Sequence, residues 1–191
     1  KDLIDSGPLE SQFGGWPDDA GLIDRYRGEV DLLVRCLREA PDDMQTATFL
    51  PAPTAKHFWA RRQCHEVEIH RIDADLAAGI SMPVDAARAT DGIDELLCGF
   101  VSRSTGNLRS EVPLTMVVTP DDVPDRWSVV ISTERPAVSR DVVADADATV
   151  SGTADLIFRC LWNRAGIEEV SVLGDPSSLS LFKERVKIRW S

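Results

Sequence analysis

The sequence has few of the patterns that mark membrane, secreted or nucleic-acid-binding proteins. It contains no apolar run long enough to span a bilayer and no signal-peptide pattern, so we expect a soluble, cytoplasmic protein without a membrane partner. Basic residues are outnumbered, with 21 Lys and Arg against 32 Asp and Glu. The resulting formal net charge of −11 argues against nucleic acid as a partner.

The sequence also lacks any pairing pattern among its cysteines. Its four cysteines are scattered, one in each of four expected helical segments, with no CxxC motif: Cys36, Cys64, Cys98 and Cys160. We therefore expect reduced, mostly structural thiols. Cys64 projects toward the expected solvent side of its helix, so it is not a candidate nucleophile.

Histidine is scarce, and all three histidines fall in one stretch between Thr54 and Gly79. No Pro or Gly interrupts this stretch before Gly79, and Thr54 follows Pro53. The sequence therefore predicts one long helix that begins at a Thr54 cap and ends at the glycine.

The polar side chains of this helix sort onto two sides when they are projected at about 100° per residue. One side is the expected solvent face: His57, Arg61, Glu68, Arg71 and Asp75. The other side is a stripe bordered by apolar residues on both flanks: Trp59, Arg62, Glu66, His70 and Asp73. This pattern predicts that the stripe points into the protein, where ionisable groups must be paired or bind a metal.

Glu66 and His70 are four residues apart, so both side chains can reach one point above the helix. A carboxylate oxygen and an imidazole nitrogen are good ligands for zinc and other first-row metals. Asp73 can orient His70 from behind, and Arg62 can hold an anionic ligand with two hydrogen bonds. The alternative is a buried network of these four side chains that only fixes helix packing.

The wording of the helix, FWARRQCHEVEIHRIDAD, resembles the metal-binding helix of the mycothiol-dependent maleylpyruvate isomerase family of actinobacteria, whose pattern reads FWxRRxxHExxxHRxDA. The later phrase TDGIDELLCGF is similar to the ADGIDEFL segment of that family. The resemblance implies a DinB-like helical bundle that binds a divalent metal, usually zinc, through Glu66, His70 and a His on an earlier helix.

No His precedes His57, and the sequence begins with Lys1. We therefore expect that an N-terminal segment with the third ligand is missing from this chain; the alternative is a relative that has lost the ligand. His57 and His65 project away from the Glu66 stripe and are poor replacements.

The remaining pattern predicts three helices followed by strands and two more helices. The first helices are expected at 20–40, 54–79 and 85–101, and the later ones at 153–164 and 175–186. Alternating strand patterns occupy 114–119, 127–133, 146–152 and 170–174. This order predicts an α+β protein with a mainly antiparallel sheet, divided into domains 1–101 and 102–191.

The phrases ADATVSGTADLIFRCLWNR and VLGDPSSLSLF resemble the C-terminal domain of the same family, which is similar to sterol-carrier proteins. In many relatives an Arg follows the Leu-Trp pair, and Arg164 occupies that place. Its guanidinium can reach a substrate carboxylate. The alternative is a solvated cation near the C-terminal dipole of its helix.

The resemblance implies a thiol chemistry in which metal-bound mycothiol is held as a thiolate and adds reversibly to an activated double bond, as in the isomerisation of maleylpyruvate to fumarylpyruvate. In that reading Glu66 and His70 bind the metal, and Arg62, Asp73 and Arg164 serve catalysis. One alternative is transfer of mycothiol to an electrophile; another is a non-catalytic binding or regulatory relative. The expected partners are a small-molecule substrate and the thiol cofactor, in a monomer or homodimer.

Overall fold

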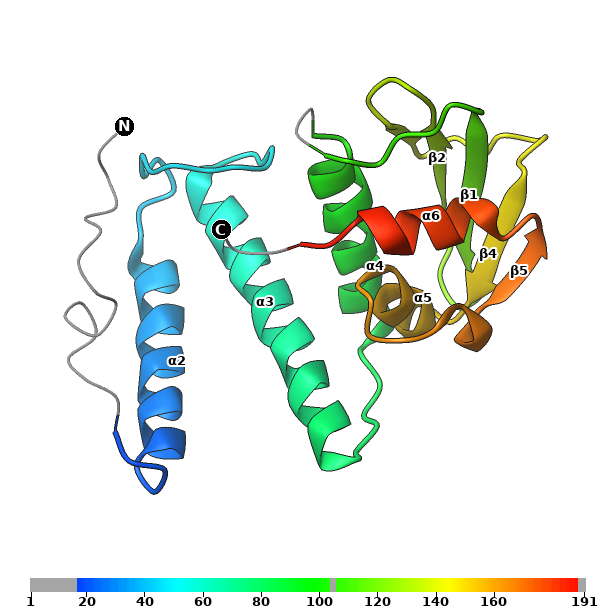
Figure 1. Ribbon diagram of the computed structural model, residues 1–191. Helices are drawn as coiled ribbons and strands as arrows, with labels where there is room; N and C mark the ends of the chain where they lie inside the picture. The colour runs from blue at the N-terminus through cyan, green and yellow to red at the C-terminus, as the bar shows by residue number, and fades with distance from the viewer. Residues whose placement is uncertain (1–16, 104–105, 189–191) are drawn as a thin grey trace. The chain divides into compact units, whose positions relative to one another are not determined.

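The computed structural model describes residues 17–103 and 106–188 of the 191-residue chain (Figure 1). Contacts between residues divide the chain into two units, residues 1–48 with 52–60 and residues 49–51 with 61–191. The second unit therefore joins most of the histidine-bearing helix to the sheet. The domain boundary expected after residue 101 was based on the sequence pattern and not on contacts, and it stays a prediction.

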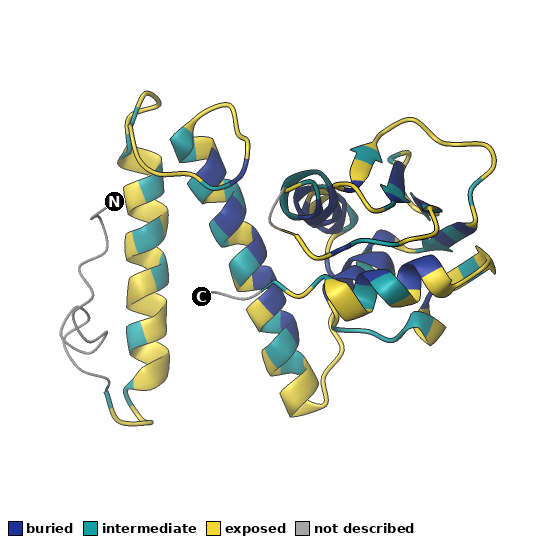
Figure 2. Ribbon diagram, turned by 45° about the horizontal axis from the view of Figure 1, so that its top comes forward, coloured by how far each residue is buried: buried dark blue, intermediate teal, exposed yellow. Residues whose placement is uncertain are grey.

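The first unit contains α2 (Leu22–Glu39) and the opening turns of α3 (Ala55–Ala78). Asp18 accepts a hydrogen bond from the backbone N–H of Gly21, the residue that caps α2. Lys56 donates to the carbonyl of Ala40 at 2.7 Å, which ties the end of α2 to the start of α3. No residue of this helix, all of which the structure describes, is buried (Figure 2).

The long helix α3 has the ends that the sequence predicted. Thr54 Oγ1 accepts a hydrogen bond from the backbone N–H of His57 at 3.1 Å, and Gly79 adopts a φ of +68° just after the last turn. Both features are standard helix ends, because the hydroxyl satisfies a free N–H and glycine tolerates a positive φ. The expected helix at 85–101 is also present, as α4 (Ala86–Asp94) followed by the π-helix η1 (Glu95–Val101), and Asp85 caps its start.

The second unit is built on a five-stranded sheet with the order β3-β2-β1-β4-β5. The strands are β1 (Leu114–Pro120), β2 (Trp127–Ile131), β3 (Ala137–Ser139), β4 (Ala148–Gly152) and β5 (Ser171–Gly174). Only the β1–β4 pair is parallel, so the predicted α+β class with a mainly antiparallel sheet is confirmed. The three-residue strand β3 was not predicted.

One face of the sheet carries the core, because side chains alternate between the two faces of each strand. Met116, Val118 and Val129 point to this face and are fully buried. They pack against α5 (Ala154–Leu161) and α6 (Ser177–Arg185), which cover the sheet in Figure 1 and contribute Phe158 and Phe182 to the same cluster. A short 3-10 turn, η2 (Ile167–Glu169), connects α5 to β5.

No helix within residues 17–103 or 106–188 is both long and apolar enough to cross a membrane.

Candidate functional site

The inward side of α3 differs from the prediction. Ile69, Ile72 and His65 are buried, whereas His70 is exposed and Glu66 is half-buried. The core is therefore reached by the apolar flank of the helix, because isoleucines gain more from burial than a stripe of ionisable groups does. The predicted polar stripe lies at the border of the core. Its first member, Trp59, belongs to the first unit and donates a hydrogen bond to the carbonyl of Ala47.

Glu68 is a second correction, because it was placed on the solvent face and is buried. Its carboxylate accepts hydrogen bonds from Arg71 and, at 2.7 Å, from Arg88. Burial raises the pKa of Glu68, but these two guanidinium groups outweigh that effect and lower it below the ordinary value. A residue on the solvent side of a helical wheel can thus be buried when partners on a neighbouring helix neutralise it.

Arg62 is the most deeply buried member of the stripe, with 0% of its side chain exposed. It forms ion pairs with Glu66 on its own helix and with Glu95 on η1. Its guanidinium also lies 5.4 Å from the ring centre of Phe100 and 5.5 Å from that of Trp162. Burial raises the pKa of Glu95, while the charge of Arg62 acts in the opposite direction. Arg62 is thus engaged by two carboxylates of this chain.

The other stripe residues form a chain of polar contacts that ends on Arg164. His70 Nε2 lies 3.4 Å from Glu66 Oε2, and His70 Nδ1 lies 3.1 Å from Asp73 Oδ2. Arg164 donates to both oxygens of Asp73 at 2.9 Å, and to the carbonyl of Trp162. The hydrogen bond from Arg164 is the main reason that the pKa of Asp73 is lowered. Arg164 therefore pairs with a carboxylate of α3 in this structure, and its expected contact with a substrate carboxylate stays a prediction.

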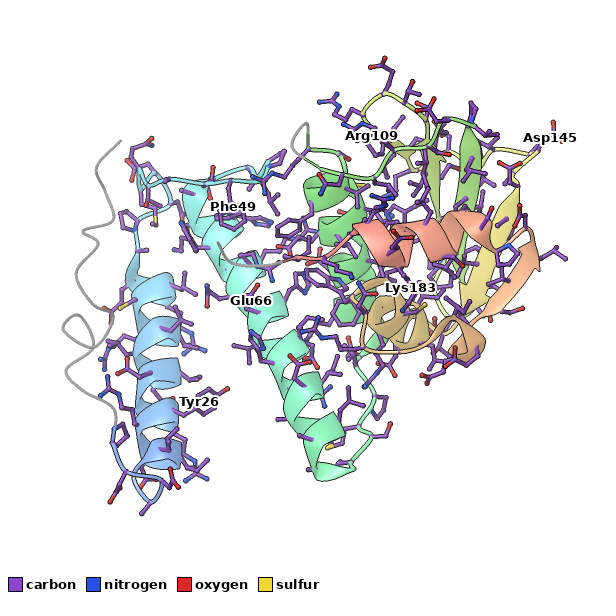
Figure 3. The ribbon with its side chains drawn as sticks, in the orientation of Figure 1. Tyr26, Phe49, Glu66, Arg109, Asp145 and Lys183 are labelled. Carbon is purple, nitrogen blue, oxygen red and sulfur yellow. The ribbon has the colours of Figure 1, made fainter. Side chains whose placement is uncertain are left out.

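Glu66 and His70 fit two ligand positions of a divalent metal site. Their nearest oxygen and nitrogen lie 3.4 Å apart, and the contact of Asp73 with Nδ1 leaves Nε2 to face Glu66. Figure 3 shows Glu66 projecting from this helix. Across the described ranges, no group of three or more His, Cys, Asp or Glu side chains is placed to hold a metal. The structure thus supplies two donors, and the third ligand stays a prediction.

His65 belongs to a separate polar network that sequence reasoning missed. It is buried, and its Nε2 lies 2.7 Å from Asp91 Oδ2, an atom that also accepts from Arg61. Burial alone would raise the pKa of Asp91, but the hydrogen bonds from His65 and Arg61 lower it to about 2. One turn later, Asp94 accepts from Trp127 of β2, which connects α4 to the sheet. The feature of the sequence that could have indicated this network is the three-residue spacing of Asp91 and Asp94.

A cleft of about 430 Å³ opens beside Arg164. Its apolar lining comes from the core and from the segment after α6: Leu96, Leu161, Trp162, Val186 and Ile188. Three basic side chains also line it: Arg164, Lys183 and Lys187. Figure 3 labels Lys183 on α6. This cleft was not predicted from the sequence, because its lining comes from segments that are far apart in the chain.

The fold and these contacts define an α+β protein whose long helix carries a carboxylate–imidazole pair at its surface. Two family models match it, the mycothiol maleylpyruvate isomerase N-terminal domain over residues 11–75 and the MDMPI C-terminal domain over residues 88–181. The chain belongs to the mycothiol maleylpyruvate isomerase family, as its helix wording predicted.

Several solved structures are similar to part of this chain. The ubiquinone synthesis protein UbiJ-SCP2 is 25% identical, with 50% of this chain and 90% of that chain covered and a TM-score of 0.38. The stereoselective inverting sec-alkylsulfatase Pisa1 from Pseudomonas sp. is 14% identical over 41% of this chain and 13% of its own, with a TM-score of 0.37. Sterol carrier protein 2 like 2 from Aedes aegypti is 16% identical over 65% and 98%, with a TM-score of 0.30. No curated protein matched the chain.

Proposed function

We propose that this protein is a mycothiol-dependent enzyme that catalyses cis–trans isomerisation of a maleylpyruvate-type substrate, with Glu66 and His70 as two ligands of a divalent metal, most suitably zinc. Membership of the family supports the reaction class. The observation that carries the metal assignment is the convergence of His70 Nε2 and Glu66 Oε2, 3.4 Å apart, on a helix of the family's N-terminal domain.

A divalent cation at this position would lower the pKa of a coordinated thiol, so that the cofactor is a thiolate at neutral pH. The protein's own contribution is orientation. Asp73 contacts His70 Nδ1 and so fixes the imidazole with Nε2 toward Glu66. Arg164 holds Asp73 in its ionised form, and Arg62 balances the charge of Glu66. In this proposal Arg62, Asp73 and Arg164 are positioning residues.

Two other functions use the same observations. The thiolate can be transferred to an electrophile instead of adding reversibly, which makes the protein a mycothiol S-transferase. A non-catalytic binding or regulatory role is favoured by one finding, the lack of a third metal ligand near Glu66 and His70 among the residues that the structure describes. In each case we expect a cytoplasmic protein that binds small molecules, not nucleic acid or membranes, as a monomer or homodimer.

Elemental analysis of the purified protein tests the metal site. We expect about one zinc per chain in the parent, and loss of that zinc in a Glu66→Gln/His70→Ala variant, because two ligands are removed. His57→Ala is the matched control, since His57 is an exposed histidine on the same helix and should leave the metal content unchanged. Asp73→Asn should weaken zinc affinity about 10- to 100-fold, the usual effect of losing a residue that orients a ligand.

No bound zinc in the parent, even after reconstitution, would refute the thiolate mechanism and favour the binding role. With zinc present, two assays separate the remaining alternatives. Mycothiol-dependent conversion of maleylpyruvate identifies the isomerase, whereas consumption of mycothiol by an alkylating substrate without isomerisation identifies the S-transferase.

A further inference from the structure

Two side chains that line the cleft beside Arg164 are fixed by hydrogen bonds within this chain. Asn163 adopts a φ of 62°, and its side-chain amide donates to the carbonyl of Val186 at 2.9 Å. This bond ties the segment after α6 to the end of α5. Asn is one of the few residues other than Gly that tolerate this backbone conformation. One wall of the cleft is therefore fixed by a residue suited to the turn.

Lys183, which also lines the cleft, is the second side chain fixed in this way. Its ammonium group donates to the carbonyl of Cys160 at 2.9 Å and to that of Ala165 at 2.5 Å, on both sides of the turn that ends α5. Both partners are carbonyl groups, which orient the ammonium without cancelling its full charge. A preformed cleft of this kind favours binding, because no ordering cost is incurred when the ligand enters.

The lining has the composition of a site for a small amphipathic anion. Part of its lining is apolar and includes Leu161, Trp162 and Ile188. Three basic side chains and one carboxylate, Glu184, line the cleft, so its formal charge is positive in a chain whose net charge is −11. A positive, partly apolar cleft on an acidic protein attracts an anion with an apolar body and disfavours a cation.

A second hollow of about 160 Å³ is lined by the same segment after α6 and also has apolar side chains in its lining. It shares Val186, Lys187 and Ile188 with the larger cleft, and adds the apolar side chains of Phe100 and Leu108. The segment after α6 thus lines both hollows. A ligand with an extended apolar body would contact more of this surface than a short dicarboxylate can.

We propose that this cleft binds a small carboxylate with an apolar chain or ring, its carboxylate near Lys187 and its body on Trp162, Leu161 and Ile188. The inference rests on the proposed function in one respect: if the protein is an isomerase or transferase, the cleft selects substrates more apolar than maleylpyruvate. Arg164 connects the cleft to Asp73, and so to the Glu66–His70 pair.

Calorimetric titration of the full chain with a series of sodium alkanoates, from butanoate to decanoate, tests the proposal. The probes contain neither a thiol nor a double bond, and no metal is added, so the result is independent of the catalytic proposal. We expect affinity to rise about three- to fourfold per added methylene until the cleft is filled, because each buried CH₂ contributes a constant increment.

Substitutions at Lys187 and Ile188 separate the charge from the apolar contacts. Lys187→Glu should weaken every alkanoate at least fivefold while the dependence on chain length persists. Ile188→Asp should flatten that dependence, and Ile188→Ala provides a milder version that retains the fold. Arg135→Glu is the matched control, since it makes the same charge change at an exposed position between β2 and β3 and should leave affinity unchanged.

Three results would overturn the proposal. They are equal affinity for octylamine and octanoate, an affinity that does not depend on chain length, and an effect of Arg135→Glu as large as that of Lys187→Glu. A parent protein that binds no zinc but still binds alkanoates would instead refute the catalytic proposal alone.

Discussion

Replacing Arg62 by Met tests whether the buried ion pairs of α3 contribute to stability as the structure indicates. The guanidinium is fully buried and neutralises Glu66 and Glu95, of which Glu95 has only 2% of its side chain exposed. Met fills similar apolar volume but leaves the Glu95 carboxylate buried without a cation. Breaking a buried pair in this way costs about 3–5 kcal/mol of unfolding free energy.

The pH dependence of this loss follows from the pKa of Glu95, which burial raises even with Arg62 present. Without Arg62 it should rise further, because the charge of Arg62 is the main influence that lowers it. A group whose pKa is raised on folding contributes stability at low pH and loses it as pH rises through the folded-state pKa. The variant should therefore be destabilised less at pH 5 than at pH 7.5.

Urea unfolding of the parent and the variant at both pH values measures these effects. A double variant, Arg62→Met/Glu95→Leu, should recover most of the stability, because an apolar pair can replace a buried ion pair at little cost. Arg27→Met is the control, since Arg27 pairs with exposed Asp24 and should lose no more than about 0.5 kcal/mol. A loss below about 1 kcal/mol for Arg62→Met, or one that is equal at both pH values, would refute the reasoning.

Two further predictions concern α4. The pKa of Asp91 is lowered to about 2, so its contribution to stability is present above its ordinary pKa near 4 and is lost as pH falls toward 2. Asp91→Asn should therefore reduce the change in urea midpoint between pH 6 and pH 3. The same change in urea midpoint in the variant and the parent would contradict this assignment. A Cβ atom added at Gly92 would lie 2.9 Å from Phe158 Cδ2 and closer still to Cε2, so Gly92→Ala should destabilise the protein by roughly 1–3 kcal/mol despite the better helix propensity of Ala. A Gly92→Ala variant as stable as the parent in the same urea titration would show that Phe158 moves freely.

Much of the fold could be predicted because its signals are local. Thr54 and Gly79 mark the ends of α3, and the alternation of residues 114–119 marks β1, because a cap, a left-handed stop and a period of two depend only on neighbouring residues. The strand β3 was missed because it has only three residues, of which one, Val138, packs on the core. Such a segment carries no period to detect.

The site was predicted in part. The spacing of Glu66 and His70 indicated that they share one side of α3, and the structure places them 3.4 Å apart. Which side of the helix faces the core was predicted wrongly, because a helical wheel ranks positions by residue type and does not include partners from other segments. Glu68 is buried since Arg88 neutralises it from α4, and Arg164 joins Asp73 across 91 positions of sequence. Neither pairing leaves a local pattern.

The wide turn of the π-helix η1 explains why the guanidinium of Arg62 contacts both a carboxylate and an aromatic ring. Glu95 and Phe100 are five residues apart, and both contact Arg62. In an α-helix, positions five apart differ in direction by about 140°, so the two side chains would point to different surroundings. A π-helix closes its hydrogen bonds between residues five apart and brings such positions close together. The π-helical turn thus places an acid and a ring side by side on this helix, whereas an α-helix of the same sequence would separate them.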